Sequence, residues 1–208
     1  TEDITQRKKN EKALVESESH FRQLADYDAL TNLPNRRLLD DRLGQVMMTS
    51  KRSGRYGALL FLDLDNFKPL NDTYGHNAGD LLLIEVAKRI NGCVRETDTV
   101  SRFGGDEFVV MLAELDKDKS ESARKAGILA EKIRVKLSEP YSLQLHREGK
   151  QEETILHRCT CSIGVVLFVN HESSPEEVLK WADLSMYEAK AQGRNCIRFF
   201  NSPPAAVV

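Results

Sequence analysis

The sequence predicts an α+β fold in which helices flank a mostly antiparallel sheet. Two observations lead to this prediction. Segments with helical and with strand-like apolar spacing are interleaved along the chain, and two strand-like segments, 98–103 and 107–112, follow one another directly as a hairpin. With 208 residues, of which 40% are hydrophobic, the chain can bury one substantial core.

The elements follow in order from apolar spacing and from turn residues. The charged segment before Pro34 lacks Gly and Pro, which predicts a helix over 4–25, although its sparse apolar positions form a poor heptad. Further helices are expected over 35–52, 78–95, 119–138 and 175–191. Strands are expected over 56–63, 98–103, 107–112, 158–168 and 196–200, with two short strands of a polar hairpin within 143–156. The polar segment 66–80 is predicted as a loop with a helical start.

The turn between strands 98–103 and 107–112 reads Gly104-Gly105-Asp106-Glu107. Glycine adopts positive φ without strain, so the Gly-Gly pair predicts a tight two-residue turn that also lets a ligand approach the backbone. Asp106 and Glu107 offer the hard oxygen ligands that Mg²⁺ prefers when it is shared with phosphates. Taken alone, these residues fit a surface hairpin with a solvated acidic tip equally well.

A second group of acids ends an apolar run of strand length. Asp63 and Asp65 follow residues 57–62, at the point where a buried strand emerges. We expect Asp63 to meet Asp106 and Glu107 across adjacent strands, in a pocket of three acids that would repel one another without a cation. For Asp65, metal binding and capping of the following turn fit the sequence equally well.

The segment 66–80 is rich in amide, carboxylate and backbone N–H groups, which suits a nucleotide beside a metal ion. The sequence contains no Walker-type glycine loop, so phosphate binding has to be built differently.

Five separated motifs resemble those of the GGDEF family, the diguanylate cyclases that condense two GTP molecules into cyclic di-GMP. They occur in the family's order between about Asp28 and Phe200. The motifs are residues 28–37, residues 63–68, residues 71–80, the Gly104–Phe108 hairpin, and residues 182–195. The first motif departs from the family pattern at Asn32, where the family has glycine.

The resemblance implies a palm-like ferredoxin-type core and a diguanylate cyclase that depends on Mg²⁺, with Mn²⁺ as an alternative. The metal would be held by the side chains of Asp63 and of Asp106 or Glu107 and by the carbonyl of Leu64. The same three acids are the expected catalytic residues, and which one accepts the proton stays open.

The resemblance also assigns the GTP contacts. Asn71 and Asp80 would read the guanine edge, because an amide and a carboxylate match its donors and acceptors. The phosphates would be held by the backbone of Asn66, Phe67 and Lys68 and by the side chains of Lys190 and Arg194, close to Gly104 and Gly105. His76 lies in the base-binding stretch, and a structural hydrogen-bonding role fits the sequence as well as contact with the base. Lys190 and Arg194 are four residues apart near a helix end. The alternative interpretation is that they only complement the helix dipole and face water.

Arg95 and Asp98 resemble the R-x-x-D site through which cyclic di-GMP inhibits members of this family. Guanidinium offers a planar face and a bidentate fork, which suits a guanine base. The family often adds an arginine from the following helix, and the candidates here are Lys132 and Arg134. A lysine in that place would lose the stacking on the base.

Catalysis in this family needs two domains that face each other, so a homodimer is the expected active form.

The chain is divided into a signalling or linker helix over 1–27, the GGDEF domain over 28–201 and a tail or linker over 202–208. The start of the chain resembles the exit of a PAS sensory domain, which is the expected upstream partner. The alternative is a catalytically silent GGDEF domain that binds GTP or cyclic di-GMP and regulates a neighbour.

The composition and the net charge limit the classes of binding partner that we expect. A net charge of −2 with mixed signs gives no basic surface for nucleic acid, and no stretch is long and apolar enough to span a membrane. The four cysteines show no C-x-x-C pairing and predict a reducing, cytoplasmic setting.

Overall fold

The structure is a computed structural model that describes residues 25–145, 153–169 and 173–201. The predicted helix over 4–25 and the predicted tail over 202–208 therefore lie almost entirely outside the described residues. The described elements are α2 (Arg36–Ser53), β1 (Gly57–Asp65), α3 (Phe67–Tyr74), α4 (His76–Asn91), β2 (Thr99–Gly104), β3 (Glu107–Leu112), α5 (Lys119–Ser138), β4 (Tyr141–Leu145), β5 (Glu153–His157), β6 (Thr160–Phe168), α6 (Pro175–Ala191) and β7 (Ile197–Phe199).

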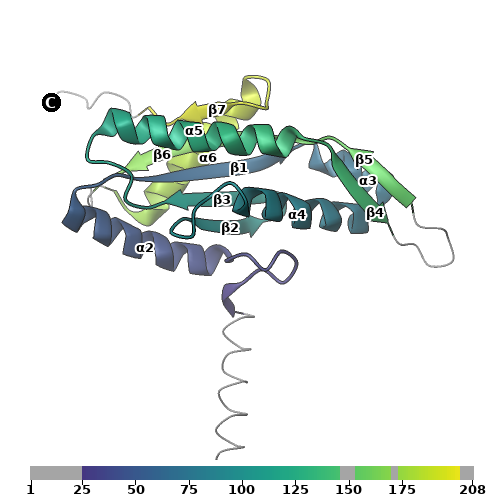
Figure 1. The fold of residues 1–208 in the computed structure, drawn as a ribbon, viewed down its shortest axis with the longest axis horizontal. Coiled ribbons are helices and arrows are strands. Elements are labelled where there is room, and N and C mark those ends of the chain that lie inside the picture. The colour runs from purple at the N-terminus through teal and green to yellow at the C-terminus, as the bar shows by residue number, and fades with distance from the viewer. Residues whose placement is uncertain (1–24, 146–152, 170–172, 202–208) are drawn as a thin grey trace, which may run out of the picture.

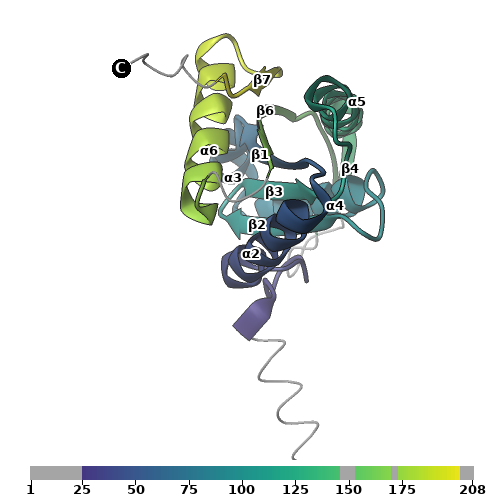
Figure 2. The ribbon, with the colours of Figure 1, turned by 90° about the vertical axis from the view of Figure 1, so that its left-hand side faces the viewer.

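The central sheet has five strands in the order β2-β3-β1-β6-β7. All neighbouring strands are antiparallel except β6 and β7, which are parallel. Helices α2 and α6 cover one face of the sheet and α4 and α5 cover the other (Figures 1 and 2). This arrangement confirms the predicted α+β class with a mostly antiparallel sheet flanked by helices.

Strand β1 lies in the middle of the sheet, and all nine of its residues are buried. Side chains alternate between the two faces of a strand. Leu60 and Leu62 accordingly pack into the core under α4 and α5, whereas Leu59 and Phe61 pack into the core under α2 and α6. The strand is therefore covered on both sides, and its end at Asp63–Asp65 is the only part of it that carries charge.

Helix α6 packs closely on β6 because Gly164 has no side chain. A Cβ atom on Gly164 would lie 2.0 Å from the carbonyl oxygen of Ala182 and 2.3 Å from the backbone nitrogen of Met186. Glycine thus lets the backbone of α6 approach the sheet.

Capping residues fix where the helices begin. Asn35 accepts a hydrogen bond from the backbone N–H of Leu38 at the start of α2, and Asp118 does the same for Glu121 at the start of α5. Ser174 forms a capping box with Glu177 at the start of α6. Helices α5 and α6 consequently have the bounds that the sequence predicted.

The segment 66–80 differs from the prediction. It forms a complete helix, α3, followed after Gly75 by α4, which begins at His76 and ends at Asn91 rather than running over 78–95. Gly75 has φ +87°, a conformation that separates the two helices. The polar residues of α3 have low helix propensity, which hid the helix, while its buried Leu70 supplies the packing that stabilises it.

Strand β1 also continues further than predicted, through both acids to Asp65, because Asp63 and Asp65 have partners in neighbouring strands. The polar hairpin predicted within 143–156 forms a separate two-stranded sheet of β4 and β5.

No helix in the part of the chain that the structure describes is long and apolar enough to cross a membrane. All four cysteines are free, and three of them, Cys93, Cys159 and Cys161, are buried.

Candidate active site

The predicted acids lie at one end of the sheet, where two of them are directly opposite each other. Asp63 in β1 lies directly opposite Glu107 in β3, and the backbone N–H of Leu64 donates to the carbonyl of Asp106 over 3.3 Å. The tight turn consists of Gly105 and Asp106, not of the Gly-Gly pair that the sequence predicted, because Gly104 still pairs with Glu107 at the end of β2. Of the two turn residues only Gly105 has positive φ, +50°.

Crowding of like charges marks this end of the sheet. Burial raises the pKa of Asp63, and the neighbouring Asp106 carboxylate adds to the rise. Burial also raises the pKa of Glu107, with further contributions from Asp63, Asp183 and Asp106. A cation placed among these carboxylates would relieve their repulsion.

Lys190 already supplies one positive charge. Its Nζ lies 2.7 Å from Oδ2 of Asp63, and it lowers the pKa of that carboxyl against the effect of burial. The lysine comes from the last turn of α6, so the ion pair joins the end of that helix to the end of β1. Lys190 therefore faces the acids and does not merely complement the helix dipole in water.

Among the described residues, no three His, Cys, Asp or Glu side chains are grouped so as to hold a metal ion on their own. Mg²⁺ does not require such a group, because it typically takes one or two protein carboxylates and completes its octahedron with phosphate and water. The adjacent carboxylates of Asp63 and Glu107, with the backbone at Leu64 and Asp106 beside them, fit that mode of binding.

The side chain of Asp65 makes contacts within the protein. Its side chain is 3% exposed and accepts hydrogen bonds from Thr160 Oγ1 (2.7 Å), from Ser162 Oγ (2.8 Å) and from the backbone N–H of Asn195 (3.0 Å). The cap position of α3 is occupied by Asn66, which makes no side-chain cap bond. Asp65 is thus an acceptor that ties β1 to β6 and to the chain after α6.

The predicted base-reading residues lie on two consecutive helices that pack together. Asn71 is in α3, and its Oδ1 is buried without a hydrogen-bond partner in the described structure. Gly79 in α4 makes room for this amide, since a Cβ on Gly79 would lie 2.0 Å from that oxygen. Asp80 and His76 are exposed on α4. A buried acceptor without a partner in the described structure is suited to a ligand that offers N–H donors.

The predicted phosphate contacts come from two elements. Asn66, with φ +58°, precedes α3, and Phe67 and Lys68 begin it, so their N–H groups belong to the first turn of a helix, where they have no partner within the helix. Lys190 lies in the last turn of α6, and Arg194 follows the helix end at Ala191, with φ +64°. Both residues therefore lie at the same end of α6, as the predicted helix over 175–191 implies.

The predicted inhibitory residues line a separate hollow of about 580 Å³ beneath the start of β2. Arg95, Asp98 and Lys132 all contribute to it, and Lys132 Nζ donates to the carbonyl of Cys93 over 2.8 Å. Arg134 does not line this hollow; it contacts Asn195 instead. Of the two predicted candidates on α5, the structure therefore brings only Lys132 to Arg95 and Asp98.

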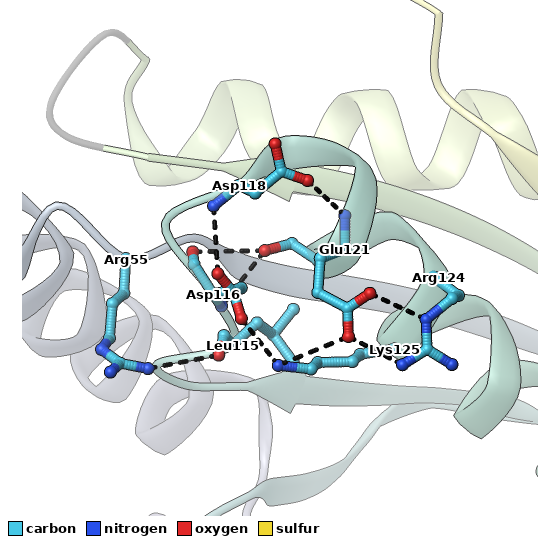
Figure 3. Close-up of polar contacts among 8 residues, drawn as sticks. Arg55, Leu115, Asp116, Asp118, Glu121, Arg124 and Lys125 are labelled. Atoms are coloured by element: carbon cyan, nitrogen blue, oxygen red, sulfur yellow. Dashed lines mark hydrogen bonds and ion pairs between the residues drawn. The ribbon is translucent and has the colours of Figure 1, made fainter.

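Figure 3 shows the start of α5, beside the same hollow. Lys125 Nζ lies 2.8 Å from Asp116 Oδ2, and Arg124 forms a two-point contact with Glu121. The hydrogen bond from Lys125 lowers the pKa of Asp116 to about 2. These two basic residues are thus already paired with acids.

Sequence reasoning assigned no role to Asp183, which raises the pKa of Glu107 and lines a hollow on the α2 and α6 face. It also missed Arg36, whose guanidinium lies 4.6 Å from the ring centre of Phe103, just before the acidic turn. The motifs 28–37 and 182–195 contain both residues, but only the packing of α2 and α6 on one face brings them to the hairpin.

Comparison with known proteins agrees with this geometry. The family model described as "Diguanylate cyclase, GGDEF domain" matches residues 25–196. The chain is 44% identical over 190 residues to the bifunctional diguanylate cyclase/cyclic di-GMP phosphodiesterase MucR of Pseudomonas aeruginosa, covering 91% of this chain and 26% of MucR. It is 38% identical to the diguanylate cyclase TpbB of P. aeruginosa, covering 84% of this chain and 37% of TpbB. The chain thus spans roughly a quarter to two fifths of the length of these relatives.

Solved structures show the same fold. The coiled coil and GGDEF domain of DgcB from Caulobacter crescentus, in complex with c-di-GMP, is 30% identical with a TM-score of 0.78, and the match covers 94% of this chain and 96% of that one. The GGDEF domain of TpbB is 36% identical with a TM-score of 0.74, over 84% of this chain and 94% of that one. The chain belongs to the GGDEF family of diguanylate cyclase domains.

Proposed function

We propose that this chain is an active diguanylate cyclase domain, which condenses two GTP molecules into cyclic di-GMP and releases pyrophosphate. The observation that carries the proposal is the pairing of Asp63 with Glu107 at the end of β1, beside the acidic turn and Lys190. The residues that the family uses for metal and nucleotide are all present, which favours an active domain over a silent one.

Each group of residues has a task in this reaction. Asn71 and Asp80 hold the guanine edge, while the first turn of α3, Lys190 and Arg194 hold the phosphates. Mg²⁺, or Mn²⁺ in its place, when bound by Asp63, the Leu64 carbonyl and Asp106 or Glu107, neutralises phosphate charge and lowers the pKa of the 3′-hydroxyl. Asp106 or Glu107 accepts the proton of that hydroxyl as it attacks the α-phosphorus of the second GTP.

Each domain binds one GTP, so two copies of the chain have to face each other for the reaction. We propose a homodimer as the active form, with residues 1–27 as a signalling helix between the cyclase domain and an upstream PAS-type sensor. The cyclic di-GMP product binds at Arg95, Asp98 and Lys132 and inhibits the domain. The four free cysteines and the use of GTP support a cytoplasmic location.

The experiment is product analysis of the purified chain incubated with GTP and Mg²⁺ at several protein concentrations. Cyclic di-GMP that forms at a rate steeper than linear in protein concentration is the expected result, because two domains have to meet. GTP binding without product at any concentration would contradict the proposal and would favour the regulatory alternative.

A further inference from the structure

The connection between α6 and β7 has an unusual backbone. Gly193, Arg194 and Asn195 have φ values of +109°, +64° and +46° in succession. Glycine adopts such values readily, whereas an arginine and an asparagine in this region are strained and need surrounding contacts to hold them. We call residues 193–195 the positive-φ loop. It carries Arg194, one of the two side chains assigned to the phosphates.

Two charged side chains from different elements contact the positive-φ loop. The carboxylate of Asp65 accepts the backbone N–H of Asn195 over 3.0 Å. The guanidinium of Arg134, on α5, donates to Oδ1 of Asn195 over 2.7 Å. Both contacts fall on the residue that directly follows Arg194, so they fix the conformation of the loop at the point where it leaves Arg194.

Each of the two charged residues is itself fixed. Asp65 is 3% exposed and accepts hydrogen bonds from Thr160 and Ser162 of β6. Arg134 forms a two-point contact with Glu131, one turn earlier on α5, over 2.9 Å and 2.7 Å. The loop is therefore attached to two rigid elements, the end of β1 and the C-terminal part of α5. Bidentate contacts of this kind give geometric precision as well as affinity.

We propose that Asp65 and Arg134 are positioning residues that hold Arg194 where it meets the terminal phosphates of the bound nucleotide. Asp65 stands two residues after Asp63 on the same strand, so β1 sets the distance between the metal-binding acid and the phosphate-binding loop. The inference rests on the proposed function, because it takes Arg194 as a phosphate ligand. It adds two residues that touch neither substrate nor metal.

The experiment compares binding of GTP and of GMP to the purified chain. Arg134→Met removes the guanidinium but keeps an apolar stem, and Asp65→Asn removes one negative charge. Each variant is expected to bind GTP about tenfold more weakly, the loss of about one charge-assisted hydrogen bond. GMP, which lacks the terminal phosphates, is expected to bind both variants as it binds the unmodified chain.

Arg124→Met is the matched control. Arg124 forms the same two-point contact with a glutamate three residues earlier, Glu121, but it lies ten residues before Arg134, about 15 Å along α5. It is expected to leave the affinities for GTP and GMP unchanged. If Arg134 acted only through general helix stability, its loss would instead weaken the binding of both GTP and GMP, or Arg124→Met would lower the GTP affinity equally.

Two further variants keep the test decisive if Asp65→Asn lowers the yield of folded protein. Asn195→Ala removes the side-chain acceptor for Arg134, leaving only the longer contact of 3.4 Å to the backbone carbonyl, and is expected to lose GTP affinity. Asn195→Asp keeps a side-chain acceptor and is expected to retain the affinity. GTP affinities of Arg134→Met and Asn195→Ala within twofold of the unmodified chain would overturn the inference, provided that Arg194→Met is impaired. Full GTP affinity in Arg194→Met would overturn the phosphate assignment itself.

Discussion

Lys190 and Asp63 form an ion pair of 2.7 Å that joins the last turn of α6 to the end of β1. The pair links a residue assigned to the phosphates with a residue assigned to the metal. Asp63 also stands opposite Glu107, so one lysine and two acids from three elements meet at this end of the sheet.

Asp63→Asn and Glu107→Gln are each expected to lower the rate of cyclic di-GMP formation by at least about 100-fold, because each removes charge that stabilises the transition state. Both variants are expected to keep the fold, since amides of the same size replace carboxylates whose pKa values are already raised by burial. Turnover and thermal melting measure the two effects. Glu188→Gln, which changes an exposed acid two residues before Lys190 on α6, is the control. Full activity in both site variants would refute the proposed metal site.

Asn71→Leu is expected to raise stability and to lower GTP affinity. The buried Oδ1 of Asn71 has no hydrogen-bond partner in the described structure, and a buried unpaired acceptor costs about 1–3 kcal/mol. Its removal should therefore raise the free energy of unfolding. GTP affinity should fall by about tenfold or more, because the guanine edge loses its amide. Denaturant unfolding and nucleotide binding test this, and efficient turnover of ATP by the unmodified chain would contradict the guanine assignment.

Lys132→Arg is expected to strengthen inhibition by cyclic di-GMP, because guanidinium can stack on a base and bind it through two N–H groups. Arg95→Ala combined with Asp98→Ala is expected to raise the rate at high product concentration and leave the initial rate unchanged. Rates measured with added cyclic di-GMP test both. If the inhibition curves of the unmodified chain, of Lys132→Arg and of the double variant coincide, cyclic di-GMP does not inhibit by binding in the hollow at Arg95.

Gly164→Ala is expected to destabilise the fold by about 1–3 kcal/mol or more, since the added Cβ would lie 2.0 Å from the backbone of α6. Gly44→Ala is the matched control in α2, where a Cβ meets nothing within 4 Å. It should instead stabilise the helix by about 1 kcal/mol. Thermal melts of both variants measure the contrast, and equal shifts would mean that α6 does not pack on Gly164 as described.

Asp28 gives a prediction about pH. Burial acts to raise the pKa of Asp28, but hydrogen bonds from Thr31 and Arg102 outweigh it and leave the pKa below the ordinary value of 3.8. Because the pKa is lowered on folding, the ionised group stabilises the protein above pH 3.8, and this contribution is lost as the pH falls through the lower, folded-state pKa.

Asp28→Asn is accordingly expected to lower the free energy of unfolding near pH 7 and to approach the unmodified chain below pH 3.8. Urea unfolding of both proteins over this pH range tests the prediction. A difference between the two proteins that does not change with pH would assign the loss to packing rather than to charge.

The pattern of the sequence was sufficient for most elements. Apolar spacing gave α5 and α6 with their observed bounds, and a tight turn lay between two strands as predicted, although it consists of Gly105 and Asp106 rather than of the Gly-Gly pair. Helix α3 was missed because its stability comes from the burial of Leu70 against other elements, which intrinsic propensity does not record.

The sequence by itself determined the family, the class of fold and the set of acids, amides and cations available for chemistry, since these depend on residue types at fixed spacings. Only the tertiary structure decided which of them meet. Asp65 became an acceptor for Asn195, and Arg134 was separated from Lys132, because strand pairing and the 3.6-residue turn of α5 set the direction of each side chain. Such directions arise from contacts between residues that are 39 to 130 positions apart, which local sequence does not contain.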